Sequence, residues 1–160
     1  MTNLHLPFGA ETYRLAPSKV ICLGQNYRAH IAESESVRVR GFGTDEPAEP
    51  VLFPKLSSAV IGTGDAIVLP EILSDYGFAD ERTHYEGELA IVLGSGGKNV
   101  PVAEALKLVL GITCANDVSQ RNIQNGDRTG WFRGKSFDTF LPIGPRVISL
   151  DEVDDIQHLA

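Results

Sequence analysis

Tyr85-Glu-Gly-Glu-Leu-Ala-Ile-Val-Leu93 is the stretch of sequence that decides the fold. Its last five residues are all apolar, and a short apolar run bounded by turn residues is typical of a buried β-strand. A glycine-rich turn at residues 94–97 ends the run. We therefore predict that residues 85–93 form the strongest strand of the domain.

Short predicted strands outnumber predicted helices on both sides of this stretch. Further strands are expected at residues 19–24, 51–53, 66–69, 108–115 and 142–148, and helices at 27–35, 99–107 and 118–124. Because strands and helices do not alternate in a βαβ rhythm, the pattern favours an α+β, mainly β roll over a doubly wound parallel sheet. Residues 1–18 show no clear period and are predicted to form an N-terminal arm, and residues 34–50 a surface loop.

Composition excludes several classes of function. The 160 residues include 14 Lys and Arg against 21 Asp and Glu, a formal net charge of −7. This excess of acid argues against binding to nucleic acid or to an anionic membrane surface, both of which require a basic face. No apolar run approaches the ~20 residues that span a bilayer. Cys22 and Cys114 lie in apolar, strand-like runs, which predicts two buried thiols in a reducing, cytoplasmic compartment.

Two carboxylates stand at the start of the predicted central strand. Glu86 and Glu88 are two residues apart, so their side chains project from the same face of the strand. Such a pair repels unless a cation lies between the two or one stays protonated. Asp117 ends another apolar run and brings a third acid to a sheet edge. Oxygen ligands of this kind select Mg²⁺ or Mn²⁺, with Ca²⁺ as an alternative, over zinc. For Glu86 and Glu88 taken alone, a solvated strand end with two surface acids is the other interpretation.

A second candidate group lies in the helix predicted at residues 27–35. His30 and Glu33 are three residues apart and therefore share a helix face. A carboxylate beside an imidazole fixes its tautomer and raises its basicity, which suits a general base. An ordinary surface pair would give the same spacing. Arg121 and Lys135 are cations that could offset the negative charge left on three acids around one divalent ion.

Seven blocks of the chain, in the same order, resemble the fumarylacetoacetate hydrolase family, and in particular its acylpyruvase-like and oxaloacetate decarboxylase-like members. The resemblance implies a mixed β-sandwich roll, a homodimer, a Mg²⁺ or Mn²⁺ site and a small 2-oxo acid as substrate. The blocks include Lys19-Val-Ile-Cys-Leu-Gly-Gln-Asn-Tyr-Arg-Ala-His30, Pro50-Val-Leu-Phe-Pro-Lys55, Ile61-Gly-Thr-Gly-Asp65, Tyr85-Glu-Gly-Glu-Leu-Ala-Ile-Val92, Ala115-Asn-Asp-Val-Ser-Gln-Arg121 and Lys135-Ser-Phe-Asp-Thr-Phe140.

The resemblance also implies roles for individual residues. The metal ligands are expected to be Glu86, Glu88 and Asp117, and the active-site lysine Lys135. His30 and Glu33 match the catalytic dyad of the acylpyruvase-like members. Gln25, Arg121 and Gln124 are the expected substrate-binding residues, although Gln25 stands where those members often carry an arginine that binds a carboxylate.

The family domain normally continues through further core strands to a Thr-Gly-Thr-Pro segment, which does not occur before Ala160. We therefore expect residues 19–160 to form a C-terminally incomplete catalytic domain. The expected function is that of a metal-dependent hydrolase or decarboxylase that cleaves a C–C bond in a small 2-oxo acid. The alternative is a truncated, non-catalytic relative, or a subunit that needs a partner chain to complete its site.

Overall fold

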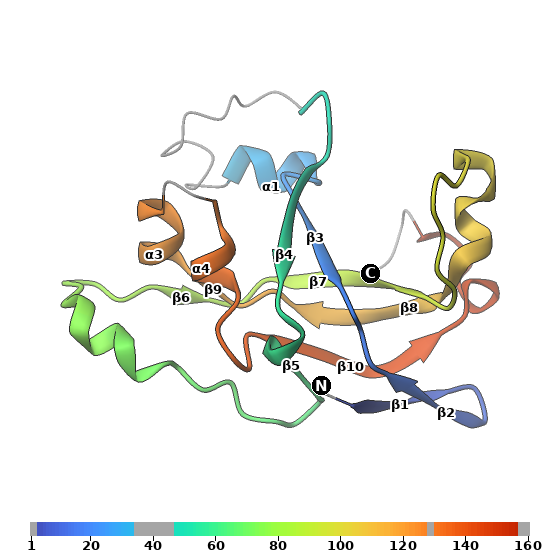
Figure 1. Cartoon of the computed structure of the whole chain (residues 1–160), viewed down its shortest axis with the longest axis horizontal. Helices are drawn as coiled ribbons and strands as arrows, with labels where there is room; N and C mark the ends of the chain where they lie inside the picture. Colours follow the sequence, from blue (N-terminus) through green and yellow to red (C-terminus); the bar gives the residue numbers. More distant parts are fainter. Residues whose placement is uncertain (1–2, 34–46, 128–129, 157–160) are drawn as a thin grey trace.

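The computed structural model describes residues 3–33, 47–127 and 130–156. A large sheet with the strand order β2-β1-β10-β8-β7 forms its body, and β5 also pairs with β10. β10 runs parallel to β1 and β5 and antiparallel to β8. The strands, shown in Figure 1, are β1 (Leu4–Phe8), β2 (Glu11–Leu15), β5 (Val60–Ile61), β7 (Gly87–Leu93), β8 (Val109–Asn116) and β10 (Leu141–Ile148).

Two small antiparallel sheets flank the large one. β3 (Val20–Gly24) pairs with β4 (Val51–Lys55), and this ribbon runs across the strands of the large sheet (Figure 1). β6 (Thr83–His84) pairs with β9 (Ser119–Gln120). Because β6 precedes β7 and β9 follows β8 in the chain, the β6–β9 pair lies where β7 begins and β8 ends.

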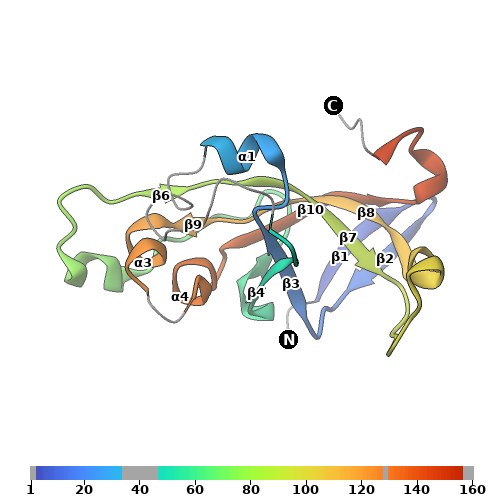
Figure 2. The same cartoon turned by 90° about the horizontal axis from the view of Figure 1, so that it is seen from above.

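The helices are short. α3 and α4 lie side by side at the end of the molecule where β6 and β9 pair (Figures 1 and 2). Within the residues that the structure describes, no helix is long and apolar enough to cross a membrane. The predicted mainly β, α+β class is confirmed. The helices are α1 (Arg28–Glu33), α3 (Arg121–Gly126) and α4 (Phe132–Lys135), with 3₁₀ helices η1 (Ser57–Ala59), η2 (Glu71–Tyr76), η3 (Val102–Leu108) and η4 (Leu150–Glu152).

The hydrophobic core joins both ends of the chain. Leu6 of β1 and Leu15 of β2 pack with Val60 of β5 and with Leu141 and Val147 of β10. Each of these side chains is buried, and burying one such aliphatic side chain contributes about 1.5–3 kcal/mol to stability. The core therefore anchors β10, which in turn holds β8 and β7 in place.

The strand predictions are confirmed for β3, β4, β7, β8 and β10, and the first predicted helix is confirmed as α1. The strand predicted at residues 66–69 is wrong, because these residues have no strand partner in the structure. Residues 4–15 of the predicted arm form the β1–β2 hairpin, which the sequence pattern did not predict. Most of the predicted loop, residues 34–46, lies outside the described residues.

Two predicted helices begin later than expected. The helix predicted from residue 99 is the 3₁₀ helix η3, and it begins at Val102 because its N-cap residue Pro101 has an extended backbone, φ −60° and ψ 145°. The helix predicted from residue 118 begins at Arg121, since the side chain of Gln120 caps it by accepting the Ile123 N–H at 2.9 Å. The prediction of two buried thiols is also corrected: Cys22 is half-buried and Cys114 is exposed.

Candidate metal centre

The paired ends of β7 and β8 bring the three predicted acids together. Gly87 lies opposite Asn116, and Glu88 lies opposite Ala115. Two further hydrogen bonds extend the ladder: the Asp117 N–H donates to the Glu86 carbonyl at 2.9 Å, and the Glu86 N–H donates to the Asn116 side-chain oxygen at 2.9 Å. As a result, one oxygen from each of Glu86, Glu88 and Asp117 lies within 4.8 Å of the others.

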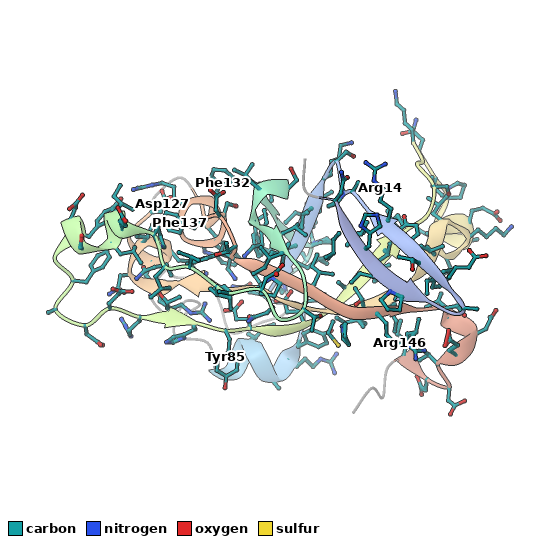
Figure 3. The ribbon with its side chains drawn as sticks, turned by 90° about the horizontal axis from the view of Figure 1, so that it is seen from below. Arg14, Tyr85, Asp127, Phe132, Phe137 and Arg146 are labelled. Carbon is teal, nitrogen blue, oxygen red and sulfur yellow. The ribbon has the colours of Figure 1, made fainter. Side chains whose placement is uncertain are left out.

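The side chain just before this group points elsewhere. Tyr85 projects from the molecular surface (Figure 3) and is 84% exposed. β7 begins only at Gly87, so Tyr85 lies outside the strand that the sequence predicted from residue 85. Asp117, by contrast, is 1% exposed. The acids therefore form a largely enclosed site, in which Asp117 is buried and Glu86 and Glu88 are half-buried.

Three cationic side chains contact two of the acids. The Lys135 ammonium donates to Glu86 Oε2 at 2.7 Å and to Asp117 Oδ2 at 2.5 Å. Arg121 donates to Glu86 Oε1, and Lys55 donates to Asp117 Oδ1. These contacts satisfy buried carboxylates that would otherwise be costly to enclose.

Burial controls the electrostatics of the remaining acid. Burial and, to a smaller extent, the negative charge of Asp117 raise the pKa of Glu88 to about 7. Burial also lowers the pKa of Lys55, although the adjacent Asp117 carboxylate partly opposes this change. Burial disfavours the charged form of the Glu88 carboxyl group, and a bound cation would stabilise that charged form.

These residues fit a divalent cation bound by oxygen. Mg²⁺ and Ca²⁺ bind oxygen ligands at about 2.0–2.6 Å, so two ligands on opposite sides of an ion are roughly 4–5 Å apart. The acid oxygens lie within that range of one another. All three donors are carboxylates, and among the described side chains no thiolate or imidazole belongs to the group. Glu86, Glu88 and Asp117 would hold the ion.

Two of the predicted substrate-binding residues adjoin this centre. Arg121 donates to the side-chain oxygen of Gln124 at 3.0 Å and to His84 Nδ1 at 3.3 Å while it pairs with Glu86. Gln124 is buried in α3. Arg121 thus contacts Glu86 directly, and Gln124 is connected to the acids through Arg121.

The third predicted substrate-binding residue, Gln25, follows β3. It is buried with a left-handed backbone, φ 55°. Among the described residues its Nε2 amide finds no hydrogen-bond acceptor. An unpaired buried donor of this kind is costly, so the position of Gln25 is consistent with a ligand group that accepts from it.

Aromatic packing fixes the position of Lys135. Its ammonium lies 4.9 Å from the centroid of the Phe53 ring, and Phe53 meets Trp131 edge to face at 5.4 Å. Trp131 in turn packs on Gly24, where an added Cβ would lie 2.1 Å from the indole ring. The β3–β4 ribbon and α4 therefore hold the ammonium over the acids together.

The structure does not test the predicted catalytic dyad. His30 and Glu33 both lie in α1, as predicted, but their side chains are outside the described part of the chain. Lys55, on the other hand, was given no role in the sequence analysis although it contacts Asp117. Its position at the end of an apolar strand was the sequence feature from which a buried lysine could have been predicted.

Comparisons with known proteins agree with this geometry. The family described as "Fumarylacetoacetate (FAA) hydrolase C-terminal" matches residues 19–160. An uncharacterized protein of Archaeoglobus fulgidus is 44% identical over 138 residues, which cover 86% of this chain and 49% of that protein. A mitochondrial oxaloacetate tautomerase of Bos taurus is 40% identical over 145 residues, which cover 89% of this chain and 41% of the tautomerase. The chain spans about half the length of the curated relatives that it matches.

A solved structure shows the same fold. The fumarylpyruvate hydrolase of Pseudomonas aeruginosa, in complex with Mn²⁺ and pyruvate, has a TM-score of 0.72 and 28% sequence identity. The match covers 98% of this chain and 64% of that enzyme. The predicted roll is therefore confirmed at the level of the fold. Together, the family match over residues 19–160 and the shared fold show that the chain belongs to the fumarylacetoacetate hydrolase family.

Proposed function

We propose that this chain is the metal-binding part of an enzyme that cleaves a C–C bond in a small 2-oxo acid, with Mg²⁺ or Mn²⁺ held by Glu86, Glu88 and Asp117. The observation that carries the proposal is the convergence of three carboxylate oxygens within 4.8 Å beside the buried ammonium of Lys135. The Mn²⁺ and pyruvate in the Pseudomonas aeruginosa relative support both the ion and the class of substrate.

The chain's own groups suit this reaction. A bound divalent ion would supply a Lewis acid for the keto oxygen of the substrate. The Lys135 ammonium, fixed over the acids, would donate to the oxygen on which negative charge develops when the bond breaks. Arg121 and Gln124 would bind the polar end of the substrate beside Glu86. Gln25 would donate its amide N–H to another substrate oxygen.

The proposed dyad separates hydrolysis from decarboxylation. Hydrolysis needs an activated water, and His30, oriented by Glu33 in the same helix, would accept its proton. Decarboxylation needs only a group that stabilises the charge left on the remaining carbon skeleton. Both reactions therefore share the centre formed by the three acids and Lys135, and only hydrolysis depends on the dyad.

The first test concerns the metal. Replacing Glu88 with Ala removes one of the three proposed ligands. We expect Mn²⁺ affinity to fall by more than the roughly 10–100-fold that loss of an outer-shell partner costs, and turnover of acylpyruvate to be lost. Mn²⁺ titration followed by electron paramagnetic resonance measures the first effect. Glu104→Ala is the matched control, since Glu104 is exposed and pairs only at the surface with Lys107. Unchanged binding and turnover in Glu88→Ala would remove the metal assignment.

The second test concerns the dyad. We expect His30→Ala to abolish hydrolysis of an acylpyruvate and to leave Mn²⁺ affinity unchanged, because His30 is not one of the proposed ligands. Decarboxylation of oxaloacetate, assayed in the same preparation, should persist. If hydrolysis proceeds at the original rate in His30→Ala, His30 has no part in the mechanism.

A second candidate function is that of a subunit that binds the ion but turns over substrate only with a partner chain. The three acids beside Lys135 support its metal-binding part. Mn²⁺ binding without turnover would favour this candidate. We further propose a homodimer and a catalytic part at residues 19–160, to which the β1–β2 hairpin of the N-terminal segment is joined through the shared core. We also propose a reducing, cytoplasmic location, supported by the free thiols of Cys22 and Cys114.

A further inference from the structure

Lys55 is a buried charged residue that the proposed reaction does not use. It ends β4, and its side chain has no exposed surface. Its ammonium donates to Asp117 Oδ1 and also, at 3.1 Å, to the carbonyl oxygen of Val118. An enclosed group with these two partners cannot reach a substrate, so any role it has must act through Asp117.

The two lysines of the site contact different oxygens of the Asp117 carboxylate. Lys135 contacts Oδ2 and Glu86 at the same time, so Oδ2 is the oxygen on the side of Glu86. Lys55 contacts Oδ1, and the Val118 carbonyl oxygen accepts a second hydrogen bond from the same ammonium. Rotation of the carboxylate would break the Lys55 contact and leave a buried ammonium poorly paired, which is strongly unfavourable.

We propose that Lys55 is a positioning residue that restricts Asp117 to one ligand oxygen and so makes the site prefer Mg²⁺ and Mn²⁺ over Ca²⁺. This inference rests on the proposed metal site. Ca²⁺ takes six to eight oxygens and often uses both oxygens of a carboxylate, whereas Mg²⁺ demands six ligands in near-ideal octahedral geometry. A carboxylate fixed to present one oxygen therefore suits the smaller ions.

The ratio of two affinities separates this geometric effect from simple charge. Removing Lys55 takes one positive charge from the surroundings of the site, which changes the attraction for every divalent cation in the same direction and to a similar degree. That change cancels in the ratio of the Ca²⁺ and Mn²⁺ dissociation constants. A change in the ratio then reports how many oxygens Asp117 can offer.

The experiment measures both dissociation constants, by Mn²⁺ titration and by Ca²⁺ competition against Mn²⁺, for the unaltered chain and for Lys55→Met. We expect the unaltered chain to bind Mn²⁺ more tightly than Ca²⁺, and Lys55→Met to reduce that preference by roughly tenfold, the effect typical of an outer-shell partner. Lys107→Met is the control, because Lys107 is an exposed lysine paired with Glu104. It should leave the ratio unchanged.

Each result decides a different point. A folded Lys55→Met variant with the original ratio overturns the inference. If Lys55→Met does not fold, the unaltered chain still gives a decisive result. Equal affinity of the unaltered chain for Ca²⁺ and Mn²⁺ overturns the inference. A clear preference for Mn²⁺ that Lys55→Gln weakens supports it. Absence of any Mn²⁺ binding that depends on Glu88 would instead refute the proposed function itself.

Discussion

At the scale of single residues, Glu88 links the site to pH. Burial raises its pKa from 4.5 to about 7, so the folded, metal-free chain keeps a proton that the unfolded chain releases. The stabilising effect of that proton is complete below the unfolded pKa and is lost as pH rises through about 7. A metal ion binds the deprotonated carboxylate, so the affinity of the site for the ion must increase with pH over the range in which the stabilising effect of the proton is lost.

We therefore expect Mn²⁺ affinity to increase with pH up to about 7 and then to level off, with release of a proton on binding at lower pH. Calorimetric titrations in buffers of different ionisation enthalpy measure both quantities. A Glu88→Gln variant has no carboxyl to titrate at this position, and its residual binding should lose the dependence. An affinity that does not change with pH in the unaltered chain would contradict this assignment.

The acids and Lys55 differ in how far sequence could predict them. Glu86 and Glu88 stand two apart at the start of an apolar run, and a strand period alone places them on one face. Lys55 acquires its role only through Asp117, 62 residues later in the chain. No local period encodes that pairing, since it depends on how the β3–β4 ribbon lies across the large sheet. The resemblance to a family supplied Lys135 but gave Lys55 no role.

At the scale of elements, the contact between β8 and β10 depends on a glycine. A Cβ at Gly111 would lie 2.2 Å from the Ile148 carbonyl oxygen and 2.8 Å from Val147 Cγ1. Backbone atoms of a paired strand cannot give way cheaply, so Gly111→Ala should separate the strands and destabilise the fold by about 1–3 kcal/mol. Because β8 delivers Asp117, Mn²⁺ affinity should fall as well.

Urea unfolding with the slope and midpoint fitted separately measures this cost. Gly87→Ala in the adjacent strand β7 is the matched control, because in the described part of the chain no heavy atom beyond Gly87 and its two chain neighbours lies within 4 Å of the added Cβ. Its midpoint should stay near that of the unaltered chain. Equal midpoints for the two variants would show that β8 and β10 have more room than the structure indicates.

Strands could be predicted from the sequence where they are apolar throughout. They could not be predicted where pairing and packing with distant strands determine whether a strand forms. β7 and β8 follow continuous apolar runs, and both were predicted. Residues 66–69 are equally apolar, but Val68 and its neighbours lie exposed without a pairing strand. The β1–β2 hairpin shows the reverse case: Leu6 is buried by β5 and β10, which lie far away in the sequence.

At the scale of the whole molecule, the β3–β4 ribbon leaves an apolar surface open. Leu23 lies opposite Leu52, and Ile21 lies opposite Pro54, so the four side chains share one face of the ribbon. Ile21 and Leu52 are 60% and 61% exposed. Contiguous apolar surface of this kind marks an interaction site more often than a free surface. We infer that a second copy of the chain covers this face in the proposed homodimer.

We expect the chain to self-associate with increasing concentration and Leu52→Glu to weaken that association, because a charge on this face would be buried without a partner. Sedimentation at several concentrations measures the effect. Leu52 is exposed in the single chain, so the urea midpoint at the lowest concentration should stay unchanged. Leu106→Glu is the control: it adds the same charge to an exposed leucine on η3, away from the ribbon (Figure 1). If both variants weaken association equally, net charge rather than this face controls it, and the homodimer must form through another surface.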